Sequence, residues 1–232
     1  MTPTELWLPI GAAAFYLYDS CCLLWQNELM LTRSRGRWLV NGGTELRIAG
    51  RRLFVPNPLL PVRPQFQVRW SINEDRPAAA DNHLLLLQAL HPIGMMNQLQ
   101  LLLLLALPFV AWTLGAGLSM LALFGLFYAF TLTCLVIAWR RRGAFGLRTR
   151  AFWFLSLDAL ACAPFCVNLT RKLSMRHGIA GDPLLFAARN LDPKSMNAIR
   201  SLISARVQEE HANDEEAERE RRIGLVLSRL AS

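Results

Sequence analysis

Charge is missing from the centre of this chain. Between Leu99 and Trp139 there is no Asp, Glu, Lys, Arg or His, a gap of 41 residues. Crossing a bilayer as a helix takes roughly 20 apolar residues. A gap of this length therefore excludes an ordinary soluble domain and predicts two membrane crossings, joined by a tight turn at Gly115–Gly117.

Motifs for catalysis and metal binding are also lacking. The sequence contains no serine elbow, no Gly-rich phosphate loop, no HExxH and no CxxC. Five cysteines lie in apolar runs without metal-ligand spacing, and their odd number argues against a disulfide framework. We therefore expect no cofactor and no metal, and the absence of these motifs favours a protein that is not an enzyme.

Lysine is nearly absent. The chain has 25 basic residues and a formal net charge of +8, yet only Lys172 and Lys194 are lysines. The arginines are spread over separate segments, two of them beside apolar runs, and no recognition-helix or base-stacking motif accompanies them. We expect the partners to be the lipid bilayer and other membrane or cytoplasmic proteins, with a homo-oligomer as one form of assembly, and no nucleic acid.

The apolar runs predict the fold class. We expect a mainly α polytopic membrane helix bundle of three to four transmembrane helices, with a small cytoplasmic antiparallel β meander and a C-terminal amphipathic helical tail. The first transmembrane helix falls in residues 1–25 and the transmembrane hairpin in residues 95–139. A fourth apolar segment, residues 151–169, either spans the bilayer or is re-entrant, because Asp158 and Pro164 interrupt it.

Arginine placement predicts the orientation. Residues 140–150 form a short basic loop that holds five arginines and no acid. Basic residues next to membrane segments favour the cytoplasmic side. The protein is therefore expected to be a multi-pass protein of a bacterial inner (cytoplasmic) membrane, with its N-terminus outside and residues 26–94 in the cytoplasm. The fourth segment decides the side of the tail, residues 170–232.

The cytoplasmic segment changes its periodicity. Apolar and polar residues alternate over residues 65–72, which is typical of a half-buried strand, and three shorter runs with Gly turn signals precede it. These runs predict a meander over about 37–72, followed by an interfacial helix over about 81–92. One face of the meander would carry four arginines, as a platform for anionic lipid or an acidic partner, or as a solvated surface: Arg37, Arg47, Arg52 and Arg69.

The tail has helix signals of its own. Asp192 followed by Pro193 gives an N-cap residue and a proline at the first helical position. An apolar stripe at helical spacing then predicts a docking helix, formed by Met196, Ile199, Leu202, Ile203 and Val207. A second apolar stripe lies beyond a charged run, within residues 223–230.

Each of the four apolar segments places one polar residue at a similar predicted depth. These residues are Asp19, Gln100, Thr133 and Asp158. Acidic groups inside a membrane are candidates for proton or cation sites, although they also serve to fix how helices pack.

The sequence leaves three functions open. We expect a non-catalytic scaffold or accessory subunit of a membrane assembly, which docks partners through the meander and the C-terminal helices. The alternative is a small oligomeric transporter or channel that uses the Asp19/Asp158 layer. A third is a membrane enzyme that acts on a lipid-linked substrate.

Overall fold

The computed structural model describes residues 3–34, 36–69, 83–114, 117–177 and 191–212. The chain divides into two compact units. Residues 1–22, 55–65 and 81–177 form a helical unit, and residues 23–54, 66–80 and 178–232 form a mixed α/β unit. The segments of each unit are far apart in the sequence.

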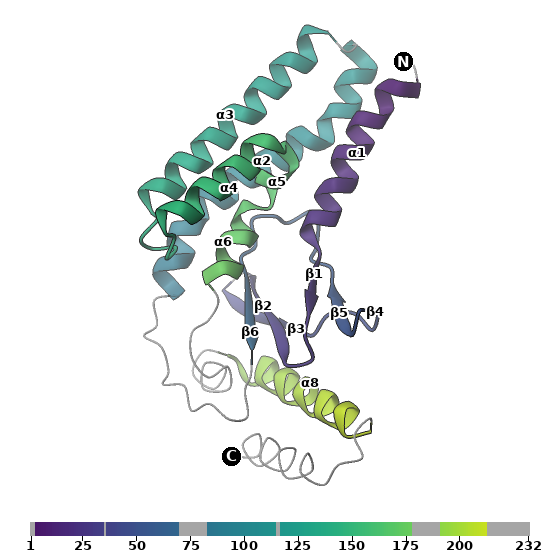
Figure 1. Ribbon diagram of the computed structural model, residues 1–232, viewed down its shortest axis with the longest axis vertical. Coiled ribbons are helices and arrows are strands. Elements are labelled where there is room, and N and C mark those ends of the chain that lie inside the picture. Colours follow the sequence, from purple (N-terminus) through teal and green to yellow (C-terminus); the bar gives the residue numbers. More distant parts are fainter. Residues whose placement is uncertain (1–2, 35, 70–82, 115–116, 178–190, 213–232) are drawn as a thin grey trace. The chain divides into compact units, whose positions relative to one another are not determined.

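The helical unit contains two helices that are long and apolar enough to cross a membrane (Figure 1). They are α2 (His83–Leu114) and α3 (Leu118–Arg140), which pack against each other. The predicted interfacial helix is the first part of α2, so it continues into the membrane-length stretch without a break. Pro92 and Pro108 lie inside α2. Helix α1 (Pro3–Ser20) joins the same unit and packs on α2.

The fourth apolar segment is broken into three helices. They are α4 (Thr149–Ala161), α5 (Ala163–Val167) and α6 (Leu169–His177). Cys162 adopts an extended conformation between α4 and α5. Pro164 explains the break, because its ring would clash with a carbonyl of the preceding turn if α4 continued.

These three helices enter the unit and return to the end where they started. Nδ1 of His177, the last residue of α6, lies 3.9 Å from the position that a Cβ would take on Gly146, just before α4. The 13 residues of α4 measure about 20 Å, which is less than the thickness of a bilayer core. Within this unit, the two ends of the segment therefore lie close together.

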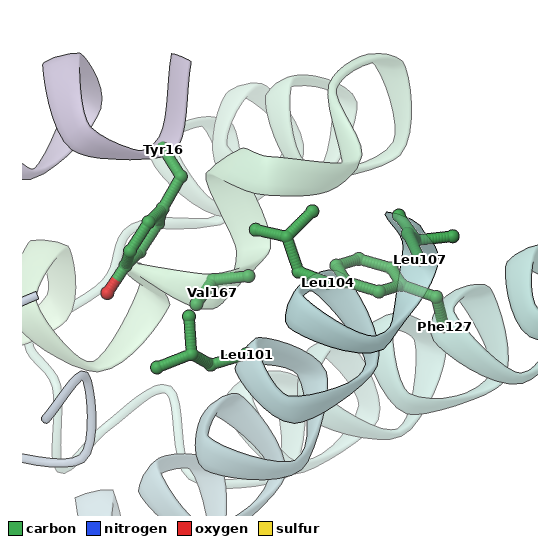
Figure 2. Close-up of a cluster of buried hydrophobic side chains, with 6 residues drawn as sticks. All are labelled: Tyr16, Leu101, Leu104, Leu107, Phe127 and Val167. Carbon is green, nitrogen blue, oxygen red and sulfur yellow. The ribbon is translucent and has the colours of Figure 1, made fainter. Parts of the chain in front are cut away.

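An apolar cluster forms the core of the helical unit (Figure 2). The cluster draws side chains from α1, α2, α3 and α5: Tyr16, Leu101, Leu104, Leu107, Phe127 and Val167. The Tyr16 hydroxyl points away from the apolar side chains and donates a hydrogen bond to the Pro58 carbonyl. The core thus ties the helices together and connects them to the proline-rich segment 55–65.

The α/β unit is built from two small sheets instead of the single meander that we predicted. One sheet has the strand order β1-β5-β4 and the other β3-β2-β6. The strands are β1 (Cys22–Leu24), β2 (Glu28–Ser34), β3 (Arg37–Asn41), β4 (Arg47–Ile48), β5 (Arg51–Phe54) and β6 (Gln65–Arg69).

The first two strands correct the sequence prediction. The run that we assigned to the end of the first helix is instead β1, since α1 ends at Ser20. Strand β2 is the centre of its sheet, yet it lies before the range over which we predicted strands. A short apolar run cannot be assigned to helix or strand by periodicity alone. The strands at 37–41, 47–48, 51–54 and 65–69 agree with the runs that predicted them, while Trp70 and Ile72 lie outside the described residues.

Helix α8 (Pro193–Ala212) completes the α/β unit. It begins at Pro193, as the Asp192-Pro193 signal predicts. The helix packs on β3, and Ser195 Oγ donates a hydrogen bond to the Trp38 carbonyl at 2.8 Å. Trp38 and Phe66 meet edge to face beneath it, with ring centroids 5.6 Å apart.

Candidate functional site: buried polar networks

The end of α1 carries an ion pair inside the helical unit. Asp19 Oδ1 lies 2.5 Å from Lys172 Nζ, and the two side chains are only 15% and 17% exposed. Asn168 Nδ2 donates a second hydrogen bond to the Asp19 carboxylate at 3.0 Å. Lys172 Nζ also lies 3.0 Å from the centre of the Phe165 ring. The carboxylate and the ammonium therefore neutralise each other in a partly dry site.

The Lys172 ammonium experiences two opposing influences. Burial lowers its pKa, while the hydrogen bond to Asp19, the Asp19 charge and the more distant Asp158 charge raise it. Asp158 itself is exposed on α4. Two of the predicted acids thus act on one lysine, although only Asp19 contacts it.

Arg171 is the largest fully buried side chain of the protein's described residues. Its guanidinium donates hydrogen bonds to the carbonyls of Asn57 and Leu60, at 2.6 and 3.3 Å, and to Ser20 Oγ and Asn168 Oδ1, at 3.1 and 2.9 Å. Burial lowers the pKa of Arg171, and neighbouring groups oppose that shift, with Tyr16 first among them. The arginine therefore joins α1, α6 and the proline-rich segment 55–65 through four acceptors.

A second, uncharged network lies between α2, α3, α5 and α6. Asn97 Nδ2 donates to the Cys166 carbonyl at 2.7 Å and to Gln100 Oε1 at 3.1 Å. Gln100 Nε2 donates to Thr131 Oγ1 at 2.9 Å, and Thr170 donates to Asn97 Oδ1 through both its backbone N–H and its hydroxyl. The Asn97, Gln100, Thr131 and Thr170 side chains are completely buried. This network fixes how the four helices pack.

The predicted polar layer is thus divided. Asp19 belongs to the ion-pair network and Gln100 to the uncharged network. Thr133 is exposed and donates its hydroxyl to the Ala129 carbonyl within its own helix. Two residues earlier in α3, Thr131 occupies the buried position. Asp158 is exposed on α4 and acts at a distance on Lys172.

Several members of these networks were missed by the sequence reasoning. Asn168 lies at the end of the fourth apolar run, and Arg171 lies beyond it. Neither residue was therefore included in the predicted polar layer. Asn97 could have been predicted from the sequence. It is a polar residue in an apolar run, three positions before Gln100, so the two side chains lie on the same face of a helix.

The α/β unit has a buried arginine of its own. Arg206 of α8 is 3% exposed. It donates hydrogen bonds to the carbonyls of Gln26 and Glu28, at 2.7 and 2.6 Å, to that of Trp25 at 3.3 Å, and to that of Gly42. Burial and the charges of Arg52 and Arg47 lower its pKa to about 10, while Glu28 raises it. The guanidinium remains charged at neutral pH and fastens α8 to two loops.

The four arginines of the predicted basic face lie on different strands and different sheets. Arg37 and Arg69 are exposed on β3 and β6, and Arg69 Nε lies 3.7 Å from Glu28 Oε1. Arg47 and Arg52 lie opposite each other on β4 and β5.

The apolar stripe of the predicted docking helix is covered within its own unit. Ile199, Ile203 and Val207 are buried, and Met196 and Leu202 are half-buried. The helix packs on β3, so the stripe stabilises the unit instead of remaining exposed for a partner.

The polar groups described above form hydrogen bonds and ion pairs that hold helices and loops together. No group of three His, Cys, Asp or Glu side chains able to hold a metal occurs in the described part of the chain. A crevice in the helical unit is lined by apolar side chains of α1, α2, α3 and α5, among them Leu104, Leu107 and Phe127.

Searches against family models, curated proteins and solved structures returned no match.

Proposed function

We propose that the protein is a multi-pass protein of a bacterial inner membrane, and that it serves as a non-catalytic scaffold or accessory subunit. The observation that carries the membrane location is the outer surface of α3. Only 22% of its apolar stretch is buried, whereas the core helix of a soluble protein would be mostly buried. Large apolar side chains cover its exposed face, including Leu118, Leu121, Leu132 and Val136. Such a surface is stable in lipid and unfavourable in water.

The proposed topology has three crossings and a re-entrant hairpin. Helix α1 measures about 27 Å, close to the thickness of the bilayer core, and joins α2 and α3 as the third crossing. Because α4–α6 return to the end that holds the basic loop 140–150, Arg171, Lys172 and Arg176 lie on the same side as that loop. The positive-inside rule then places the N-terminus outside and both the basic loop and the tail in the cytoplasm.

The scaffold role is supported by how the polar groups are used. Asp19 is neutralised by Lys172, and Arg171 and Arg206 are engaged by backbone carbonyls. These contacts hold helices and loops in place. The exposed strands of the α/β unit then offer the surface for a protein partner.

Site-specific photo-crosslinking in cells tests the scaffold role. A photoreactive residue at exposed Leu39 of β3 should give a discrete crosslinked protein, whereas one at Leu121 of α3 should react with lipid. The absence of any protein adduct at Leu39 and at other exposed β3 positions would contradict the scaffold.

The Asp19–Lys172 pair, with Asp158 nearby, favours a second candidate, a transporter or channel. Proteoliposomes that contain the wild-type protein should hold a proton gradient if the protein is a scaffold. A leak in the wild type that disappears in the Asp19→Asn/Asp158→Asn variant would replace the scaffold with a transporter.

A further inference from the structure

The β4–β5 hairpin has two unlike faces. Its two-residue turn consists of Ala49 and Gly50, both with positive φ (51° and 75°), as in type I′ hairpins. Arg47 lies opposite Arg52, and Ile48 lies opposite Arg51. Residues directly opposite each other project to the same face of a strand pair. One face therefore carries Arg47 and Arg52, and the other carries Ile48 and Arg51.

The face with Ile48 is apolar and open. Ile48 is 47% exposed, and Leu46, two residues earlier and thus on the same face, is 59% exposed. The Arg51 guanidinium lies 3.8 Å from the ring centre of Trp25, which is itself exposed beside β1. Exposed aliphatic side chains next to a tryptophan and an arginine are typical of elements that lie at a membrane–water interface.

The opposite face concentrates positive charge. Like charges directly opposite each other on two strands repel. The same two arginines also disfavour the charged form of Arg206, whose pKa they help to lower. The charges of Arg47 and Arg52 thus act on Arg206 of the same unit, and the Ile48 face is the one left for contact with lipid.

We propose that the β4–β5 hairpin binds the anionic headgroups of the bilayer, with Leu46 and Ile48 in the interface and Arg51, which lies on the same face, at lipid phosphates. This proposal rests on the proposed membrane location. Chain connectivity favours lipid over an acidic protein as the occupant. Strand β1 pairs with β5, and a single residue, Cys21, separates β1 from α1. The sheet is thereby tied to the cytoplasmic end of a proposed crossing, where anionic lipids lie.

The test uses the full-length chain with its five cysteines replaced, in lipid nanodiscs. A polarity-sensitive fluorophore is attached at Ile48→Cys, and its quenching by spin-labelled lipid is measured. Nanodiscs of phosphatidylcholine alone are compared with nanodiscs that also contain phosphatidylglycerol. Quenching is expected in the anionic nanodiscs and much less in the neutral ones. Leu39→Cys, exposed on β3, is the matched control and should not be quenched.

Charge variants separate attraction by lipid from simple proximity. Arg51→Gln should weaken insertion of the label in anionic nanodiscs by about fivefold. Arg37→Gln removes the same charge from the other sheet and should leave the insertion of the label unchanged. Leu46→Ser keeps every charge and should also reduce quenching, which provides a second variant if Arg51→Gln does not fold.

Three outcomes overturn the proposal. A label at residue 48 that is as open to an aqueous quencher as the one at residue 39, in both lipids, excludes the lipid contact. An equal loss of quenching in Arg51→Gln and Arg37→Gln excludes a local site. Shielding by added polyglutamate, without any quenching by lipid, assigns the hairpin to an acidic protein. A label at Leu132→Cys in α3 keeps the two proposals apart, because it reports lipid whether or not the hairpin does.

Discussion

The two units distribute polar and apolar side chains in opposite ways. The helical unit buries Asn97, Gln100 and Arg171 and exposes leucines along α2 and α3. The α/β unit buries Trp38, Phe66 and Ile203 and exposes arginines. This difference is the one expected if, as proposed, one unit folds against lipid and the other against water.

One device is common to both units. Each contains a buried arginine, Arg171 or Arg206, that donates hydrogen bonds to backbone carbonyls of segments far earlier in the sequence. A buried carbonyl without a donor is costly, and a planar guanidinium with five N–H groups can serve several acceptors at once. The following predictions test the contrast between the units, from the largest expected effect to the smallest.

Replacing either buried arginine should destabilise its own unit. Arg171→Met or Arg206→Met leaves several carbonyls without donors, so a loss of about 3 kcal/mol in unfolding free energy is expected. Hydrogen exchange read by mass spectrometry should show faster exchange around residues 55–65 for Arg171→Met, and around 25–42 for Arg206→Met. Lysine should not rescue either site, because an ammonium cannot reach all the acceptors.

The loss of unfolding free energy caused by Arg206→Met should be the same at any pH well below 10. Its folded-state pKa, about 10, is lower than the ordinary value of 12.5, so the unfolded chain binds more protons only between these values. The stability of the α/β unit with Arg206 therefore rises with pH only in that window. The unfolding free energies of wild type and Arg206→Met are measured between about pH 6 and 8, the neutral range. A difference between them that changes with pH in this range would contradict a pKa of about 10 for Arg206.

Truncating one aliphatic side chain in each unit should lower the free energy of unfolding by different amounts. Ile203→Ala removes a side chain that is 1% exposed and should cost about 2–4 kcal/mol. Leu132→Ala, at an exposed position of α3, should change stability in lipid by less than about 1 kcal/mol, because it leaves no cavity. Chemical denaturation of both variants in nanodiscs measures the two losses, and equal losses would remove the contrast.

Gly42 tests how closely α8 approaches the sheet. A Cβ at this position would collide with the Leu202 side chain and the Arg206 guanidinium. Gly42→Ala should therefore destabilise the α/β unit by about 1–3 kcal/mol. Gly36→Ala is the control for the added methyl group, since open space surrounds Gly36; its positive φ adds a strain of about 1 kcal/mol, which is subtracted from the comparison.

The smallest effect is expected at the hairpin turn. Ala49 is the non-glycine residue with positive φ among the described residues, and such a conformation costs an L-residue about 1 kcal/mol. Ala49→Gly should relieve this strain and slow hydrogen exchange in β4 and β5 slightly. Faster exchange in these strands would show that the turn is not strained.

The sequence predicted the membrane-length helices because their signal is local. A long stretch without charge and a helix start at Asp192-Pro193 can be read from neighbouring residues alone. The return of α6 toward the start of α4 could not be predicted, since Pro164 marks a break without fixing the direction that follows. The pairing of Lys172 with Asp19, and of Arg206 with residues 25–42, could not be predicted, because these contacts join segments more than 150 residues apart.

Strand β2 shows a different limit. Its residues Glu28–Ser34 mix acidic, apolar and basic side chains and lack a clean alternation, so nothing local distinguished them from a loop. Their pairing with β3 supplies the missing information. For the same reason, the apolar stripe of α8 was interpreted as a docking surface, although β3 covers it.

The solvent around α3 tests the account most directly. Spin labels placed one at a time at Leu121, Leu132 and Val136, all exposed, are to be compared with a label at Leu39 of the α/β unit in the same nanodiscs. Collision with oxygen, which concentrates in lipid, should dominate at the three α3 sites, and collision with a water-soluble nickel complex should dominate at residue 39. Nickel accessibility at the α3 sites equal to that at residue 39 would contradict the division of the protein between lipid and water.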